Sequence, residues 1–131
     1  MRNHRDYETV RYHLMYSELV LAARQRGMVL YPELARICGF RDETMETTKR
    51  LGEILVVISQ NEVKHERPML SALAVRPKGV VPIAFFNHAR LLGLLHSDNA
   101  DEEKAFWLSQ KDACYRTWQQ YLMDDYSTPD Y

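Results

Sequence analysis

The sequence predicts a mainly helical protein with one small β-hairpin. Apolar residues recur at helical spacing in several separate stretches of the 131 residues. Two short apolar runs, 69–75 and 80–83, are separated by a Pro-Lys-Gly turn, which is typical of a hairpin. With 46% hydrophobic residues, a chain of this length can bury a core of its own. We therefore expect a single domain spanning residues 1–131.

The first two helices are predicted over residues 6–26 and 31–39. Apolar residues recur on one face of the first helix, and Gly27 ends it. In the second, Pro32 fits the first helical turn and Gly39 supplies the left-handed stop. A helix this short is not stable alone, so it must dock against a neighbour.

A longer helix is predicted over residues 44–64, followed by the hairpin. The polar, partly basic run 47–50 precedes apolar residues at helical spacing, as in a recognition helix. Pro68 prevents the helix from continuing. A short helix, a turn, a longer helix and a hairpin are the elements of a winged helix-turn-helix. We expect this core at residues 27–83.

The remaining residues, 84–123, predict further amphipathic helices interrupted near residues 96–98. Asn99 and Glu102 match a capping box at the start of the last helix. That helix has apolar residues around more than half its circumference, more than a peripheral helix needs. We expect part of it to hold a second copy or another protein. The candidate contact residues are Trp107, Tyr115, Trp118 and Leu122.

Charge and cysteine usage restrict the possible partners and compartment. The formal net charge of −1 gives no general attraction to a polyanion, so a nucleic-acid contact needs a local patch. Residues 67–96 contain four basic residues and no carboxylate. The sequence shows no signal peptide or membrane span, which predicts a cytoplasmic protein without membrane contact. Cys38 and Cys114 lack metal-ligand spacing and are expected to be buried free thiols.

These patterns make nucleic-acid binding the leading prediction. The start of the long helix would enter a groove of double-stranded DNA, and the hairpin tip would contact flanking phosphates. Glu43, Glu46 and Glu53 lie nearby, so binding should be modest and steeply salt-dependent. The same charges would also suit a simply solvated surface. The candidate nucleic-acid-binding residues are Tyr31, Thr47, Thr48, Lys49, Arg50, Arg76 and Lys78.

Residues 27–79 resemble the winged-helix DNA-binding part of alkylguanine DNA alkyltransferases and alkyltransferase-like proteins. The matching stretches are Tyr-Pro-Glu-Leu-Ala at 31–35, Lys-Arg-Leu-Gly-Glu-Ile-Leu at 49–55 and the run 68–75. The resemblance implies that Tyr31 contacts a phosphate and that Lys49 occupies the place of an intercalating arginine. At 68–71, Pro-Met-Leu-Ser replaces the family's Pro-Cys-His-Arg, so alkyl transfer is not predicted. The alternative is a small bacterial winged-helix protein sharing only this architecture.

No enzyme activity, cofactor or metal is predicted. Glu62 and His65 lie one helical turn apart, as in metal sites of helical bundles, but the sequence lacks a second such pair. His88 and His96 would need further ligands that the sequence does not reveal. Ser71 has no nucleophile turn around it. The competing prediction is an accessory protein-interaction module built on a winged-helix scaffold.

Gly52 lies inside the predicted long helix, where glycine costs about 1 kcal/mol relative to alanine. Two explanations are open. The docking helix could approach the long helix closely at this point, or a DNA backbone could do so.

Overall fold

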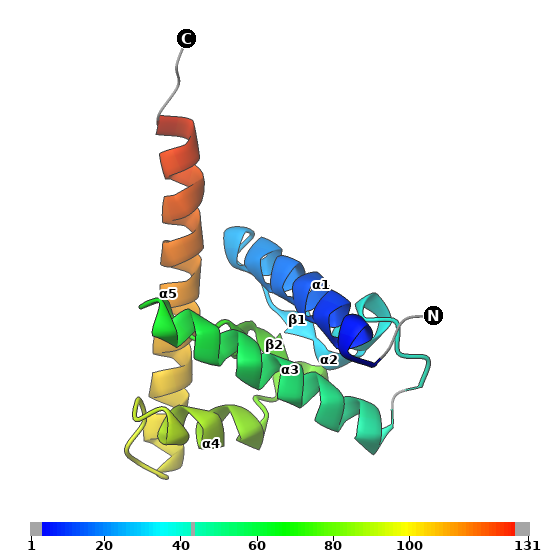
Figure 1. The fold of residues 1–131 in the computed structure, drawn as a ribbon. Helices are drawn as coiled ribbons and strands as arrows, with labels where there is room; N and C mark the ends of the chain where they lie inside the picture. Colours follow the sequence, from blue (N-terminus) through cyan, green and yellow to red (C-terminus); the bar gives the residue numbers. More distant parts are fainter. Residues whose placement is uncertain (1–3, 43, 128–131) are drawn as a thin grey trace.

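The computed structural model describes the backbone of residues 4–42 and 44–127 and the side chains of residues 8–42 and 44–119. Its helices are α1 (His4–Arg24), α2 (Tyr31–Ile37), α3 (Met45–Lys64), α4 (Ile83–Leu91) and α5 (Ala100–Ser127). Two 3-10 helices, η1 (Leu70–Leu73) and η2 (Pro77–Gly79), and two short strands, β1 (Val29–Leu30) and β2 (Ala74–Val75), complete the described fold. The predicted mainly helical class is confirmed. Helix α5 runs along one side of the molecule, and α4 lies beside the N-terminal end of α5 (Figure 1).

The starts of α3 and α5 lie close to the predicted positions. The Thr44 hydroxyl accepts a hydrogen bond from the Thr47 backbone N–H at 3.2 Å, so α3 begins immediately after Thr44. At the start of α5, Asn99 Oδ1 accepts hydrogen bonds from the backbone N–H groups of Asp101 and Glu102. The capping box also predicts that Glu102 accepts a hydrogen bond from the Asn99 N–H. That N–H instead donates to Ser97 Oγ at 3.0 Å.

The predicted β-hairpin is replaced by another arrangement. All of residues 69–75 are buried, so this run crosses the core as η1 and β2 and does not form a surface wing. Strand β2 pairs in parallel with β1, with Val29 opposite Ala74. The tight turn does form, since the Arg76 N–H donates to the Val80 carbonyl at 2.8 Å. Pro82 has no N–H with which to extend this ladder, and it caps α4.

The main hydrophobic core lies between α1, α2, α3, η1 and α5. Each of these elements contributes a side chain with no exposed surface, namely Met15, Leu34, Ile58, Leu73 and Cys114. A second, smaller cluster lies beneath α4 and includes Phe85, Ala89 and Leu95. The flanking helices α1 and α5 therefore belong to the same core as the central helices.

Three residues predicted to hold a partner pack within their own chain. Tyr115 and Trp118 are each 9% exposed, and the Tyr115 hydroxyl donates to the Gly27 carbonyl at 3.0 Å. The Trp107 indole N–H donates to the Ala72 carbonyl at 2.8 Å. Helix α5 needs its broad apolar surface because it packs against both α1 and η1. The fourth candidate, Leu122, lies outside the described side chains.

Both cysteines are free and buried, as predicted. Burial raises the pKa of the Cys38 thiol to about 11. Burial, together with the negative charge of Glu62, raises the pKa of the Cys114 thiol to about 12. Within the described residues, no helix is both long enough and apolar enough to cross a membrane.

Candidate binding groove

A groove of about 540 Å³ lies between α3 and the segment 76–84. Helix α3 contributes Thr48, Lys49, Gly52, Glu53 and Val56 to its lining. Arg76 and residues 80–84 line the opposite side, and Tyr31 at the start of α2 also lines it. We call this feature the α3 groove. It brings together four of the predicted site residues, Tyr31, Thr48, Lys49 and Arg76.

Two cations reach the α3 groove from different elements. Lys49 is on α3 and Arg76 follows β2, and both side chains are exposed. Neither side chain makes an ion pair or hydrogen bond with another described residue. Lys78 lies nearby in the exposed turn, with a φ of 67°. Glu53 lines the same groove and partly offsets the positive charge.

Arg50 and Thr47 bond to residues outside the α3 groove. Arg50 forms an ion pair with Glu8 of α1, and its guanidinium carbon lies 5.1 Å from the centre of the Phe40 ring. Burial alone would raise the pKa of the Glu8 carboxyl, but hydrogen bonds and attraction from Arg50 and Arg11 lower it. Thr47 is buried, and its hydroxyl donates to the Asp42 carbonyl at 2.7 Å. These two predicted site residues hold α3 to its neighbours and lie outside the groove lining.

Gly52 lines the α3 groove without being required by internal packing. A Cβ atom added at this position would meet no atom within 4 Å. Close approach of the docking helix therefore does not explain the glycine. Its lack of a side chain instead leaves the α3 backbone open to a molecule in the groove.

A small hollow of about 20 Å³ shares Tyr31, Gly52 and three other lining residues with the α3 groove. Tyr31 and His88 are each only 8% exposed there, and neither side chain has a hydrogen-bond partner among the described residues. We call it the Tyr31–His88 hollow. Burial raises the pKa of Tyr31 to about 12, although Arg76 acts in the opposite direction. Burial also lowers the pKa of His88, so both groups are uncharged at neutral pH.

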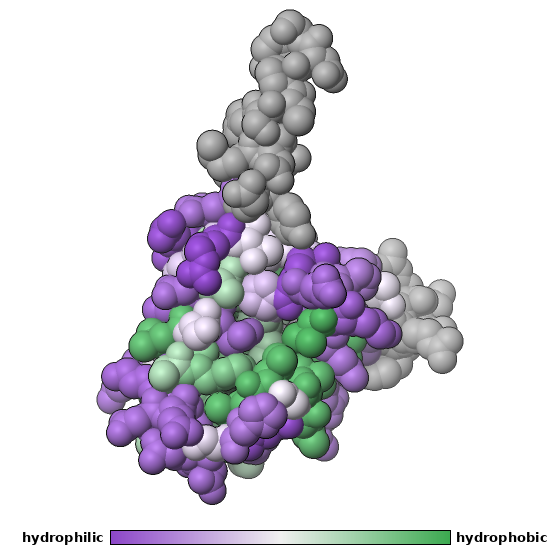
Figure 2. All heavy atoms as spheres, turned by 90° about the vertical axis from the view of Figure 1, so that its left-hand side faces the viewer, coloured by the Kyte–Doolittle hydropathy of each residue, from purple (hydrophilic) through white to green (hydrophobic). Residues whose placement is uncertain are grey.

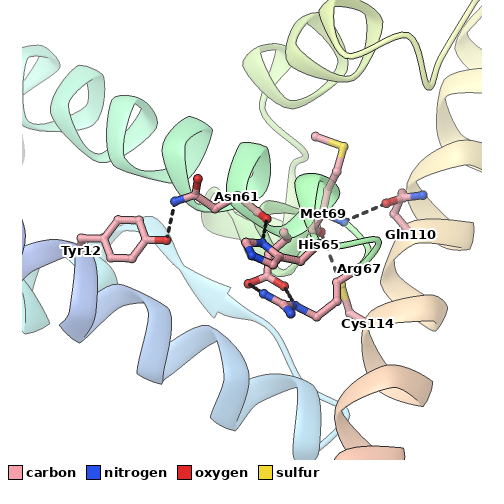
Figure 3. A network of polar contacts seen from close by, with 8 residues as sticks. Tyr12, Asn61, His65, Arg67, Met69, Gln110 and Cys114 are labelled. Atoms are coloured by element: carbon pink, nitrogen blue, oxygen red, sulfur yellow. Dashed lines mark hydrogen bonds and ion pairs between the residues drawn. The ribbon is translucent and has the colours of Figure 1, made fainter.

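The other residues considered for chemistry have structural partners. Ser71 lines the hollow, but its hydroxyl accepts a hydrogen bond from the Ser59 hydroxyl at 2.7 Å. Glu62 is fully buried and pairs with Arg67, whereas His65 is exposed and its Nδ1 lies 2.8 Å from the Asn61 carbonyl (Figure 3). Glu62 and His65 thus do not form a metal site. No cluster of three potential metal-binding side chains occurs in the described part of the chain.

Large apolar side chains are also exposed at the end of α4, in the loop that follows it and on α5. Leu91 is 85% exposed, and Leu94 and Leu108 are also exposed. Figure 2 views the molecule from the side of α4 and α5 and shows apolar residues gathered in its lower half, bordered by hydrophilic ones. The sequence did not predict this area, because the partner contact was assigned to the aromatic face of α5. It did not predict the Tyr31–His88 hollow, because the two residues are far apart in the sequence.

Comparisons with protein-family models, curated proteins and solved structures found no match to this chain.

The burial of His88 predicts a loss of stability at mildly acidic pH. Its pKa is lowered in the folded chain, whereas in the unfolded chain it is near the ordinary value of 6.5. Below that value the unfolded chain binds a proton that the folded chain does not, so stability falls by up to about 1.4 kcal/mol per pH unit. Urea unfolding across this range should show a weaker pH dependence for His88→Gln. An identical pH dependence in both proteins would contradict this assignment.

Proposed function

We propose that this chain is a non-enzymatic nucleic-acid-binding protein with a winged-helix-like arrangement. In this arrangement α2 supports α3, and the turn after β2 takes the place of the wing. One observation carries the proposal: Lys49 and Arg76 approach one groove from different elements, beside a glycine that packing does not require. Two cations on a shared groove suit the phosphates of a nucleic-acid backbone.

The groove offers contacts of two kinds. Arg76 can hold a phosphate through two N–H groups, Lys49 acts as a point charge, and Lys78 can reach a neighbouring phosphate. On the same side of the groove as Arg76, Val80 and Ile83 are 55% and 75% exposed and can contact sugars or base faces. The cations of the groove thus suit the charged phosphates, and its apolar side chains suit the sugars and bases.

Removing both groove cations should weaken nucleic-acid binding strongly. For the double variant Lys49→Gln and Arg76→Gln, we expect the slope of log affinity against log salt to fall by about 1.5. At low salt, affinity for a double-stranded DNA should fall about tenfold or more. Fluorescence anisotropy over a salt series, with duplex and single-stranded DNA, measures both quantities.

The matched control replaces Lys64 and Lys104, two exposed lysines on α3 and α5 outside the groove, with glutamine. It changes the net charge equally and should leave the slope nearly unchanged. Equal losses in the two double variants would mean that only overall charge matters. Unchanged binding by the groove variant, with an unchanged circular dichroism spectrum, would refute the proposed role of the groove.

A second candidate function is an accessory protein-interaction module. The exposed leucines at the end of α4 (Leu91), in the following loop (Leu94) and on α5 (Leu108) favour it. Figure 2 shows apolar residues gathered on this side of the molecule, which suits a protein contact. Its partner complex should survive the groove substitutions and be lost on Leu91→Asp with Leu108→Asp. If the nucleic-acid proposal holds instead, nucleic-acid binding should be lost with the groove substitutions and should survive Leu91→Asp with Leu108→Asp.

A further inference from the structure

We propose that the Tyr31–His88 hollow recognises a single sugar hydroxyl of the nucleic acid bound in the α3 groove. This inference rests on the proposed function and specifies which chemical feature of the ligand is read. The hollow then provides a means of telling strands that carry accessible hydroxyls from strands that do not.

Two buried polar side chains in the hollow point to a ligand. Tyr31 and His88 are more than nine-tenths buried and have no hydrogen-bond partner among the described side chains and backbone. Neither residue contributes a fully buried polar atom without a partner, so the polar atoms of both keep a small accessible surface that water or a ligand group in the hollow can hydrogen-bond. Both residues line the same hollow, and a ligand group that enters it would replace the water there.

The size of the hollow restricts what can enter. Its volume of about 20 Å³ corresponds to a single water-sized group. A phosphate or a base ring is too large. A phosphate would also bring a charge into a site where burial already disfavours the charged forms of Tyr31 and His88.

A hydroxyl matches the hydrogen-bonding groups that remain. The Tyr31 hydroxyl can donate to it, and it can donate to the unprotonated ring nitrogen of His88. Ser71 already bonds to Ser59 and is not needed. Gly52 borders both the hollow and the groove, so no side chain from this position blocks the way in.

Nucleic acids carry sugar hydroxyls in two places. Every RNA nucleotide has a 2′-hydroxyl, whereas a DNA strand has one only at its 3′ end. The test therefore compares labelled strands of about 12 nucleotides and identical sequence. These are DNA with a 3′-phosphate, DNA with a 3′-hydroxyl, RNA with a 3′-phosphate, and the same RNA with every 2′-hydroxyl methylated.

If the hollow reads the 2′-hydroxyl, RNA should bind about tenfold more tightly than 3′-phosphorylated DNA, and methylation should remove the difference. If it reads a chain end, only the DNA with a 3′-hydroxyl should gain. In either case Tyr31→Phe should abolish the preference without changing the salt slope. The control Tyr12→Phe should retain it, because the Tyr12 hydroxyl bonds Asn61 outside the groove.

Equal binding of all four strands with a normal salt slope would overturn the hydroxyl assignment and leave the nucleic-acid proposal standing. The hollow would then hold a water only. A preference that persists in Tyr31→Phe would also overturn it. No salt-dependent binding of any strand would refute both this inference and the proposed function.

Discussion

Replacing Glu62 with alanine is expected to lower the free energy of unfolding by about 3–5 kcal/mol. Glu62 is on α3, has no exposed surface and receives Arg67 on both carboxylate oxygens. Burial and a hydrogen bond with Glu62 also raise the pKa of the Tyr16 hydroxyl on α1. Without the carboxylate, Arg67 and Tyr16, which are both partly buried, each lose an interaction.

This pair occupies a junction between several elements. Around it, the Met69 N–H donates to Gln110 of α5 at 2.9 Å, and the Cys114 thiol donates to the Met69 carbonyl at 3.3 Å (Figure 3). The Arg67 guanidinium carbon lies 5.9 Å from the centre of the Trp118 ring. Loss of Glu62 should therefore loosen the packing of α5 as well as the end of α3.

Urea unfolding followed by circular dichroism measures the Glu62 effect. A companion variant that changes both residues, Glu62→Leu with Arg67→Met, should recover most of the lost stability, because both charges of the pair are then replaced by apolar groups. Exposed Glu66 offers a matched control, since Glu66→Ala on the same segment should change stability by less than about 0.5 kcal/mol. A loss no larger for Glu62→Ala than for this control would contradict the assigned role.

Substitutions at Gly52 are expected to separate stability from binding. Gly52→Ala should raise the free energy of unfolding by about 0.5–1 kcal/mol, because the new Cβ meets nothing within 4 Å and helix propensity improves. Gly52→Leu should keep much of the stability gain while filling the α3 groove. Nucleic-acid affinity should then fall about tenfold or more.

The matched control for Gly52→Leu is Gln60→Leu. Gln60 is exposed on the same helix and lies outside the α3 groove lining. It should change neither the thermal midpoint nor the affinity appreciably. A stabilised Gly52→Leu protein with unchanged affinity would show that the groove is not where the ligand lies.

Local signals in the sequence were sufficient to locate most helices. Asn99 caps α5 as expected, and α3 begins within one residue of the predicted start, because helix ends depend on residues one turn away. The run 69–75 was misassigned for the opposite reason. A continuous apolar run does not reveal whether it lies at a surface edge or crosses the core, and the partner of β2 is distant in the sequence.

The candidate site was only partly predictable for the same reason. Lys49 and Arg76 were identified from residue type, and the structure brings them to one groove. Arg50 has the same chemistry, yet the distant Glu8 pairs with it. Residue type and helical spacing cannot indicate such long-range pairs, nor could they place His88 beside Tyr31.

The parallel pairing of β1 with β2 has a consequence for how the chain folds. It closes a long loop that contains α2 and α3, and loop closure costs conformational entropy before its contacts are gained. Helices α2 and α3 can meet early because they are neighbours in sequence. Arg76 and the wall that follows it are positioned only after the closure, so we expect ligand affinity to develop with the slowest refolding phase.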